Sequence, residues 1–170
     1  MKRPEFLKEM SGDNNHRLLL WDAIRETKGK VVEFGSGHGS TPYLRKQCKD
    51  AKRTFESYDN GKEWAEKHGS TYVPNNNWDG VKVKGGVALI DHAPGERRHV
   101  DIRNRVNDFD IFVIHDSEPI GAGDYKYETI WSLFKYRVDV KTEGAWATAV
   151  SNRVDVTKWK DRKFGKYVIS

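Results

Sequence analysis

The chain has 170 residues, of which 30 are Lys or Arg and 25 are Asp or Glu, and its formal net charge is +5. This length suits a single domain, residues 1–170, that buries a core without an internal linker. The one cysteine, Cys48, excludes an internal disulfide and fits a reducing compartment. We find no signal-like apolar run and no segment of membrane-spanning length, so we expect a cytoplasmic protein with no membrane partner.

The first predicted helix is capped by Asp13 or Asn14 and ends at Gly29, because polar residues precede an apolar run and a glycine follows it. A strand is predicted over residues 30–34. A glycine loop then leads into a second helix, residues 40–49.

The chain then continues with alternating strands and helices. Residues 53–58 form a predicted strand, residues 62–68 a short helix, residues 70–74 a weaker strand and residues 75–80 a turn. This strand–loop–helix alternation predicts a parallel sheet.

The remaining elements complete a predicted α/β fold. It is a Rossmann-like, mostly parallel sheet with helices on both faces and a C-terminal antiparallel hairpin. The predicted elements are buried strands at 87–91 and 109–116, a helix at 127–134, a hairpin of 137–141 with 146–151 about Glu143 and Gly144, and an extended stretch to residue 169.

The glycine loop contains Gly35, Gly37 and Gly39 at alternate positions after a buried strand. Glycines remove Cβ atoms where the backbone turns sharply and where a ligand approaches closely. A helix that starts after such a loop points its free N–H groups at the ligand. Glu33 lies two residues before the first glycine, where a buried charge needs a polar ligand or partner.

This pattern, Glu-x-Gly-x-Gly-x-Gly after two valines, resembles the first motif of class I S-adenosylmethionine (SAM)-dependent methyltransferases. It differs from the Gly-x-Gly-x-x-Gly of dinucleotide-binding folds. The resemblance implies that Gly35, Ser36, Gly37 and Gly39 hold the methionine end of SAM and that Glu33 lies close to it. The alternative is a glycine-rich turn that holds no ligand.

Asp59 ends the second predicted strand, twenty residues after Gly39. An acid at this place can accept hydrogen bonds from both hydroxyls of a ribose. The methyltransferase resemblance assigns that role to Asp59 and places Asn60 beside the adenine. The alternative is an Asp-Asn-Gly turn without a ligand.

Two later strands end in Asp91-His92 and in His115-Asp116-Ser117, which resemble strand ends of catechol O-methyltransferase and its relatives. That resemblance implies a magnesium ion held by Asp91 and Asp116 and a cofactor contact at His92. Ser117 replaces the expected Asn and is a poorer ligand, which puts the metal in doubt. Without a metal, Asp91, His92, His115 or Asp116 would act as base or substrate anchor, or the histidines would only form hydrogen bonds at strand ends.

About thirty residues separate Asp59 from Asp91, so one crossover helix is expected to be reduced to a loop. The segment His92-Ala93-Pro94-Gly95 departs from the Asn/Asp-Pro-Pro-Tyr/Phe signature of amino-group DNA methyltransferases, which disfavours base methylation. Arg97, Arg98 and Arg103 follow; they could bind an acidic substrate, although such residues are more often solvated.

The leading interpretation is a SAM-dependent methyltransferase that transfers a methyl group to a small-molecule acceptor, at oxygen. One alternative is a nucleic-acid or protein methyltransferase, since residues 153–170 contain six Lys or Arg interleaved with Trp159, Phe164 and Tyr167. Another is a non-catalytic SAM-binding module. An oxidoreductase is disfavoured by the glycine spacing, and the sequence fixes neither the acceptor nor the oligomeric state.

Overall fold

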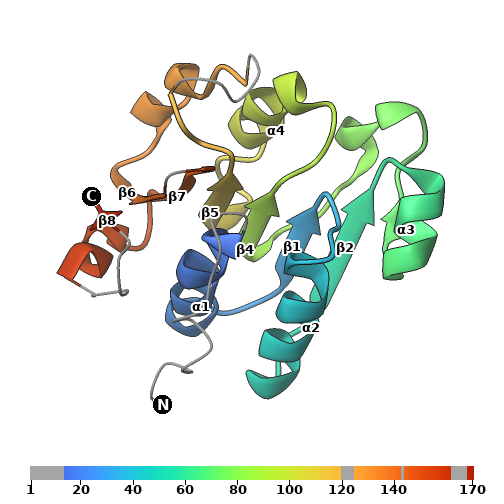
Figure 1. Ribbon diagram of the computed structural model, residues 1–170, viewed down its shortest axis with the longest axis horizontal. Helices are drawn as coiled ribbons and strands as arrows, with labels where there is room; N and C mark the ends of the chain where they lie inside the picture. Colours follow the sequence, from blue (N-terminus) through green and yellow to red (C-terminus); the bar gives the residue numbers. More distant parts are fainter. Residues whose placement is uncertain (1–13, 120–124, 143, 162–167) are drawn as a thin grey trace.

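A computed structural model describes residues 14–119, 125–142, 144–161 and 168–170. The described strands form one eight-stranded sheet in the order β3-β2-β1-β4-β5-β7-β6-β8 (Figure 1). The strands β3, β2, β1, β4 and β5 run parallel, whereas β7 is antiparallel to both β5 and β6. The predicted α/β fold, with its mostly parallel sheet and C-terminal hairpin, is confirmed.

The strands and helices have the following bounds. The strands are β1 (Val31–Phe34), β2 (Phe55–Asp59), β3 (Thr71–Tyr72), β4 (Gly85–Ile90), β5 (Phe109–His115), β6 (Tyr136–Lys141), β7 (Ala147–Ser151) and β8 (Val168–Ile169). The α-helices are α1 (His16–Glu26), α2 (Ser40–Asp50), α3 (Lys62–His68) and α4 (Arg98–Asn104). Short 3-10 helices are η3 (Pro74–Asn76), η4 (Trp78–Gly80), η5 (Gly95–Arg97), η6 (Tyr127–Thr129), η7 (Trp131–Leu133) and η8 (Val156–Asp161).

Two hydrophobic layers cover the two faces of the sheet, because successive side chains of a strand point to opposite faces. Val31 packs with α1, α2 and η8 on one face. Val32 and Phe34 pack with α4 and the 3-10 helices η4 and η6 on the other. The central strands are buried on both faces, as expected for parallel strands covered by helices.

The register of the parallel strands aligns their carboxyl ends. Phe34 of β1 pairs with Tyr58 of β2 and with Ile90 of β4, which pairs in turn with Ile114 of β5. One residue further along each strand therefore forms a single row across the sheet. The members of this row are Asp59, Gly35, Asp91 and His115.

The reduced crossover predicted between Asp59 and Asp91 is confirmed. After β3 the chain passes only through the 3-10 helices η3 and η4 before β4 begins. Trp78 of η4 is fully buried against this face of the sheet and fills space that a crossover helix would cover.

Two predicted elements are wrong. Residues 127–134 form two 3-10 helices, η6 and η7, because Ile130 between them has φ −116° and breaks the helix. The extended C-terminal stretch is interrupted by η8, whose Trp159 is fully buried in the α1-side core.

The start of the first helix differs from its predicted cap. Asn15 is the N-cap of α1 and makes no side-chain cap bond; its side chain donates instead to the carbonyl of Ala145. Asp13 lies outside the described residues. Among those residues, no helix has the length and apolar character needed to cross a membrane.

Candidate functional site

The glycine loop that follows β1 lies at the row of strand ends. Gly35 has φ +91°, and a Cβ there would lie 2.5 Å from the carbonyl oxygen of Asp91. A Cβ on Gly39 would lie 2.5 Å from Asn14 Oδ1. Gly35 is therefore needed for the protein's own packing, whereas a Cβ on Gly39 would require the Asn14 side chain to move.

Gly37 differs from its two neighbours in the loop. Among the described residues, a Cβ there meets nothing closer than Ser40 Oγ at 3.4 Å, which is ordinary contact. Its backbone N–H donates to Thr41 Oγ1 at 2.9 Å, and its carbonyl accepts from Thr41 N. The two hydrogen bonds to Thr41 thus hold the loop, while the space beside Gly37 stays open.

Glu33 lies beneath this loop and is fully buried. Its Oε2 accepts hydrogen bonds from Ser57 Oγ at 2.6 Å and from Thr41 Oγ1 at 2.8 Å. Within the described part of the chain, Oε1 has no hydrogen-bond partner. Burial raises the pKa of Glu33 to about 7, against the opposing hydrogen bonds of the surrounding hydroxyl groups.

The raised pKa of Glu33 predicts a pH-dependent stability. Between the ordinary value near 4.5 and about 7, the folded protein keeps a proton that the unfolded chain releases. The Glu33 contribution to the free energy of unfolding therefore falls by roughly 3 kcal/mol as pH rises through this window. Urea titrations from pH 4.5 to 7.5 are expected to show that the free energy of unfolding of Glu33→Gln increases, relative to that of the unsubstituted protein, as the pH rises. Glu63→Gln, at an exposed position of α3, serves as the control; equal pH slopes for Glu33→Gln and the parent would contradict the account.

Asp59, at the end of β2, is tied to the glycine loop. Its Oδ2 accepts from the backbone N–H of Ser36 at 2.8 Å and from Ser36 Oγ at 3.0 Å, and its Oδ1 accepts from Gly61 N at 2.8 Å. The indole N–H of Trp64 donates to the carbonyl of Ser36 at 2.6 Å. Because a carboxylate offers about four acceptor positions, Asp59 retains capacity for a ligand. Asn60 donates to Asn76 Oδ1 beside it.

The ends of β4 and β5 bring together Asp91, His115, Asp116 and Arg98. Arg98 Nη2 lies 3.1 Å from Asp91 Oδ1, and Arg98 Nη1 lies 3.3 Å from Asp116 Oδ2. His115 Nδ1 lies 3.3 Å from Asp91 Oδ1 and 3.3 Å from Asp116 Oδ1. The four side chains form a closed ring in which each carboxylate lies between the guanidinium and the imidazole.

His115 is the residue of this ring whose type ordinarily titrates near neutral pH. Its side chain is 13% exposed. Burial disfavours its charged form, but the hydrogen bond to Asp91 and the charges of Asp91 and Asp116 outweigh burial and raise its pKa. Its Nε2 has no partner in the described residues. The ring of His16 from α1 packs edge-on against it, with ring centroids 4.8 Å apart.

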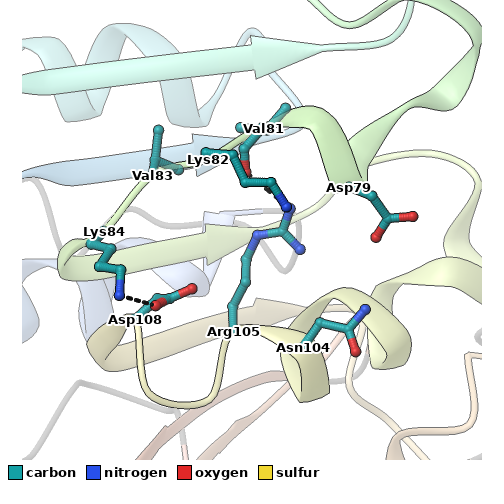
Figure 2. Close-up of a pocket in the computed structure, with 8 residues that line it drawn as sticks. All are labelled: Asp79, Val81, Lys82, Val83, Lys84, Asn104, Arg105 and Asp108. Atoms are coloured by element: carbon teal, nitrogen blue, oxygen red, sulfur yellow. Dashed lines mark hydrogen bonds and ion pairs between the residues drawn. The ribbon is translucent and has the colours of Figure 1, made fainter.

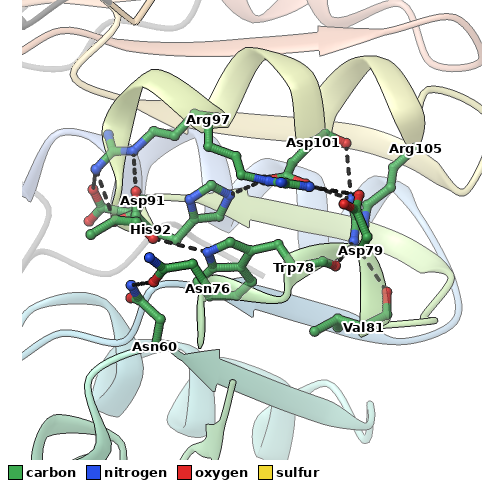
Figure 3. A network of polar contacts seen from close by, with 12 residues as sticks. Asn60, Asn76, Trp78, Asp79, Val81, Asp91, His92, Arg97, Asp101 and Arg105 are labelled. Atoms are coloured by element: carbon green, nitrogen blue, oxygen red, sulfur yellow. Dashed lines mark hydrogen bonds and ion pairs between the residues drawn. The ribbon is translucent and has the colours of Figure 1, made fainter. Parts of the chain in front are cut away.

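His92 lies apart from these residues, although the sequence placed it beside Asp91. Its side chain turns to the other face of the sheet, where the ring is fully buried and stacks on Trp78 at 4.4 Å (Figure 3). Its Nε2 lies 3.1 Å from Asp101 Oδ2, and Asp101 also pairs with Arg105. Burial lowers the pKa of His92 despite Asp101. The structure thus gives this ring a packing role, and the cofactor or catalytic contact expected at His92 stays a prediction.

The magnesium site expected from Asp91 and Asp116 does not fit these residues. Asp91, His115 and Asp116 do offer ligand atoms within 4.8 Å of one another. However, the guanidinium of Arg98 already forms ion pairs with both carboxylates. Ser117, at the expected third ligand position, is buried and bonds to Thr148 Oγ1 at 2.7 Å on β7.

The three arginines that follow β4 differ in exposure, since Arg98 is buried whereas Arg103 lies at the surface. Arg98 is 6% exposed and belongs to the ring described above. Arg97 pairs with Asp79 at 2.6 Å and with Asp101 at 3.1 Å, while Arg103 donates to the carbonyl of Thr129. Sequence analysis missed the role of Arg98; a basic residue between two predicted strand-end carboxylates was the available clue.

The described part of the basic C-terminal segment offers little for base stacking. The indole of Trp159 is fully buried and its N–H donates to Glu26 Oε1 at 3.0 Å. Phe164 and Tyr167, the other two predicted aromatic contacts, lie outside the described residues.

A cavity of about 420 Å³ lies at the opposite edge of the sheet, where β4 and β5 begin (Figure 2). Lys84 and Asp108 form an ion pair of 3.0 Å on its wall. It contains none of the predicted site residues, which all lie at the carboxyl ends of the strands. This arrangement agrees with the general rule that open α/β sheets bind ligands at the carboxyl edge.

Comparison with known proteins gives similarity of fold. No protein-family model matches the chain, and no curated protein matches it. A putative O-methyltransferase from Klebsiella pneumoniae is 12% identical over 85% of this chain and 82% of its own, with a TM-score of 0.59. The O-methyltransferase TomG from Streptomyces achromogenes, solved with SAM, is 12% identical over 88% and 91%, with a TM-score of 0.57. The METTL16 methyltransferase domain is 14% identical over 81% and 82%, with a TM-score of 0.56.

Proposed function

Because the chain has the fold of the class I SAM-dependent methyltransferases, we propose that it is such an enzyme and that it methylates a small molecule at oxygen. The observation that carries the proposal is the open space beside Gly37, between the buried Glu33 and the strand-end Asp59. Gly35 serves the protein's own packing, whereas among the described residues the absent side chain at Gly37 makes room for no other part of the protein. A ligand that approaches the backbone closely accounts for it.

The residues around the loop fit the functional groups of SAM. The unpartnered Oε1 of Glu33 suits the cationic amino group of the methionine end. Asp59 suits the ribose hydroxyls, and Asn60 suits the adenine. When bound, SAM supplies a methyl group that its sulfonium already activates.

The acceptor must lose a proton during transfer to oxygen, and we propose that His115 accepts it. Its Nδ1 faces Asp91 and Asp116, which supports a fixed ring orientation, and its Nε2 is buried without a protein partner in the described residues. In this proposal Nε2 of His115 would take up the proton that the acceptor hydroxyl releases when it is methylated. Positioning supplies most of the remaining rate enhancement.

The ribose role of Asp59 predicts weaker SAM binding in Asp59→Ala. Loss of a charge-assisted hydrogen bond costs on the order of 1–3 kcal/mol, so the dissociation constant should rise about tenfold or more. Calorimetry with SAM measures this change. Asp50→Ala, at the exposed end of α2, is the matched control, and an unchanged affinity in Asp59→Ala would place ribose recognition elsewhere.

The acceptor class is tested by transfer of a labelled methyl group from SAM to a panel of phenols, alcohols, amines, RNA and proteins. Transfer to small hydroxylated compounds is the expected result. Labelled RNA or protein would replace this proposal with a macromolecular acceptor. Tight SAM binding without transfer to any member would indicate a non-catalytic binding module.

A further inference from the structure

The ring at the strand ends contains a cation that belongs to the protein. We propose that Arg98 takes the place that a divalent metal would have between Asp91 and Asp116, so that the site works without metal, and that losing this arginine creates a metal site. That this ring takes part in methyl transfer rests on the proposed function, whereas its metal-binding behaviour does not.

Arg98 makes hydrogen bonds or ion pairs through every nitrogen of its guanidinium. Its Nε donates to the carbonyl of His92 at 2.7 Å, and its Nη2 donates to the carbonyl of Asp91 at 3.0 Å. With the two carboxylates and a longer contact to the carbonyl of His115 at 3.4 Å, all three guanidinium nitrogens are engaged. The ring of Tyr125 lies over the guanidinium, with its centroid 4.8 Å from Cζ.

Charge balance explains why a guanidinium and a metal exclude each other here. Asp91 and Asp116 carry two negative charges near His115. Arg98 supplies one positive charge, on a side chain that is 7% exposed. A divalent ion entering this space would meet a buried like charge at close range and would find the carboxylate oxygens already shared. Without Arg98, two carboxylates and an imidazole within 4.8 Å form a set that suits Mn²⁺.

A purely structural function for Arg98 makes a different prediction. Its bonds to the carbonyls of Asp91 and His92 join α4 to the end of β4, so its loss would lower stability under either account. A structural clamp, however, gives no reason for metal binding to appear. Arg98→Lys keeps the charge, whereas Arg98→Gln keeps an amide donor for the carbonyls and removes the charge.

The experiment titrates the full chain with Mn²⁺ alone and follows free Mn²⁺ by electron paramagnetic resonance. The parent protein and Arg98→Lys are expected to bind no stoichiometric Mn²⁺. Arg98→Gln and Arg98→Ala are expected to bind one ion at least about tenfold more tightly than the parent. Adding Asp116→Asn to either variant should abolish that binding, which locates the ion.

Thermal melts with and without Mn²⁺ keep the test decisive for destabilised variants. Mn²⁺ should raise the melting temperature of Arg98→Gln and leave that of the parent unchanged. Stoichiometric Mn²⁺ binding by the parent overturns the proposal, as does a folded Arg98→Gln or Arg98→Ala without a gained site. Because no step uses SAM, a failure of SAM binding would reject the proposed function without changing this result.

Discussion

Gly37→Val is expected to abolish SAM binding while the protein stays folded. In the part of the chain that the structure describes, a Cβ at this position meets only Ser40 Oγ at 3.4 Å, so the side chain extends into open space beside the loop. Its two methyl groups would then occupy the volume that we assign to the methionine end of SAM. Calorimetry should detect no binding, and a thermal melt should show one cooperative transition near that of the parent.

Two other glycines give matched comparisons for this variant. Gly144→Val, where a Cβ meets no described atom within 4 Å, should bind SAM as the parent does. Gly35→Val should lose the fold itself, because its Cβ would clash with the Asp91 backbone at φ +91°. A folded Gly37→Val with parental affinity would remove the loop from the cofactor site.

His115→Gln is expected to lower turnover about 10²- to 10⁴-fold, the range typical of a lost general base, with little change in SAM affinity. Glutamine retains a hydrogen-bonding group of similar length but cannot take up a proton near neutral pH. Turnover should be measured with the acceptor that the panel identifies. SAM affinity is measured separately by calorimetry.

His99→Gln on α4 controls for general effects of histidine replacement and should retain parental turnover. Parental turnover in His115→Gln would show that another group of the ring accepts the proton. Loss of SAM affinity in step with turnover would instead indicate a cofactor contact or a collapsed site.

The sequence predicted the row of strand ends because that row depends on local patterns. The predicted strands end at or beside Asp59, Gly35, Asp91 and Asp116, and parallel strands bring such ends to one edge. The shortened crossover was equally readable, since thirty residues cannot hold another strand with full helices on both sides.

The side of the sheet on which each residue lies was harder to predict. Asp91 and His115 share a face with Glu33, whereas His92 follows Asp91 and turns to the opposite face. The alternation of side chains along a strand would place Asp91 and His92 on opposite faces of the sheet. Both residues lie beyond the last residue of β4, however, where this alternation no longer determines the direction of a side chain.

The partners of buried charges were not readable from local sequence. Arg98 reaches residues seven and eighteen positions away, and its distance from them depends on how α4 packs on the sheet. The failed helix at residues 127–134 has a similar cause, because aromatic and β-branched side chains there pack into the core as 3-10 turns. Tertiary packing decided both outcomes.

Calorimetric titration of the unsubstituted protein with SAM and S-adenosylhomocysteine, with NAD as the comparison ligand, tests the central claim most directly. The account predicts that both sulfur compounds bind with one-to-one stoichiometry, that NAD does not compete, and that magnesium changes neither affinity. A folded protein that binds neither SAM nor S-adenosylhomocysteine would contradict it.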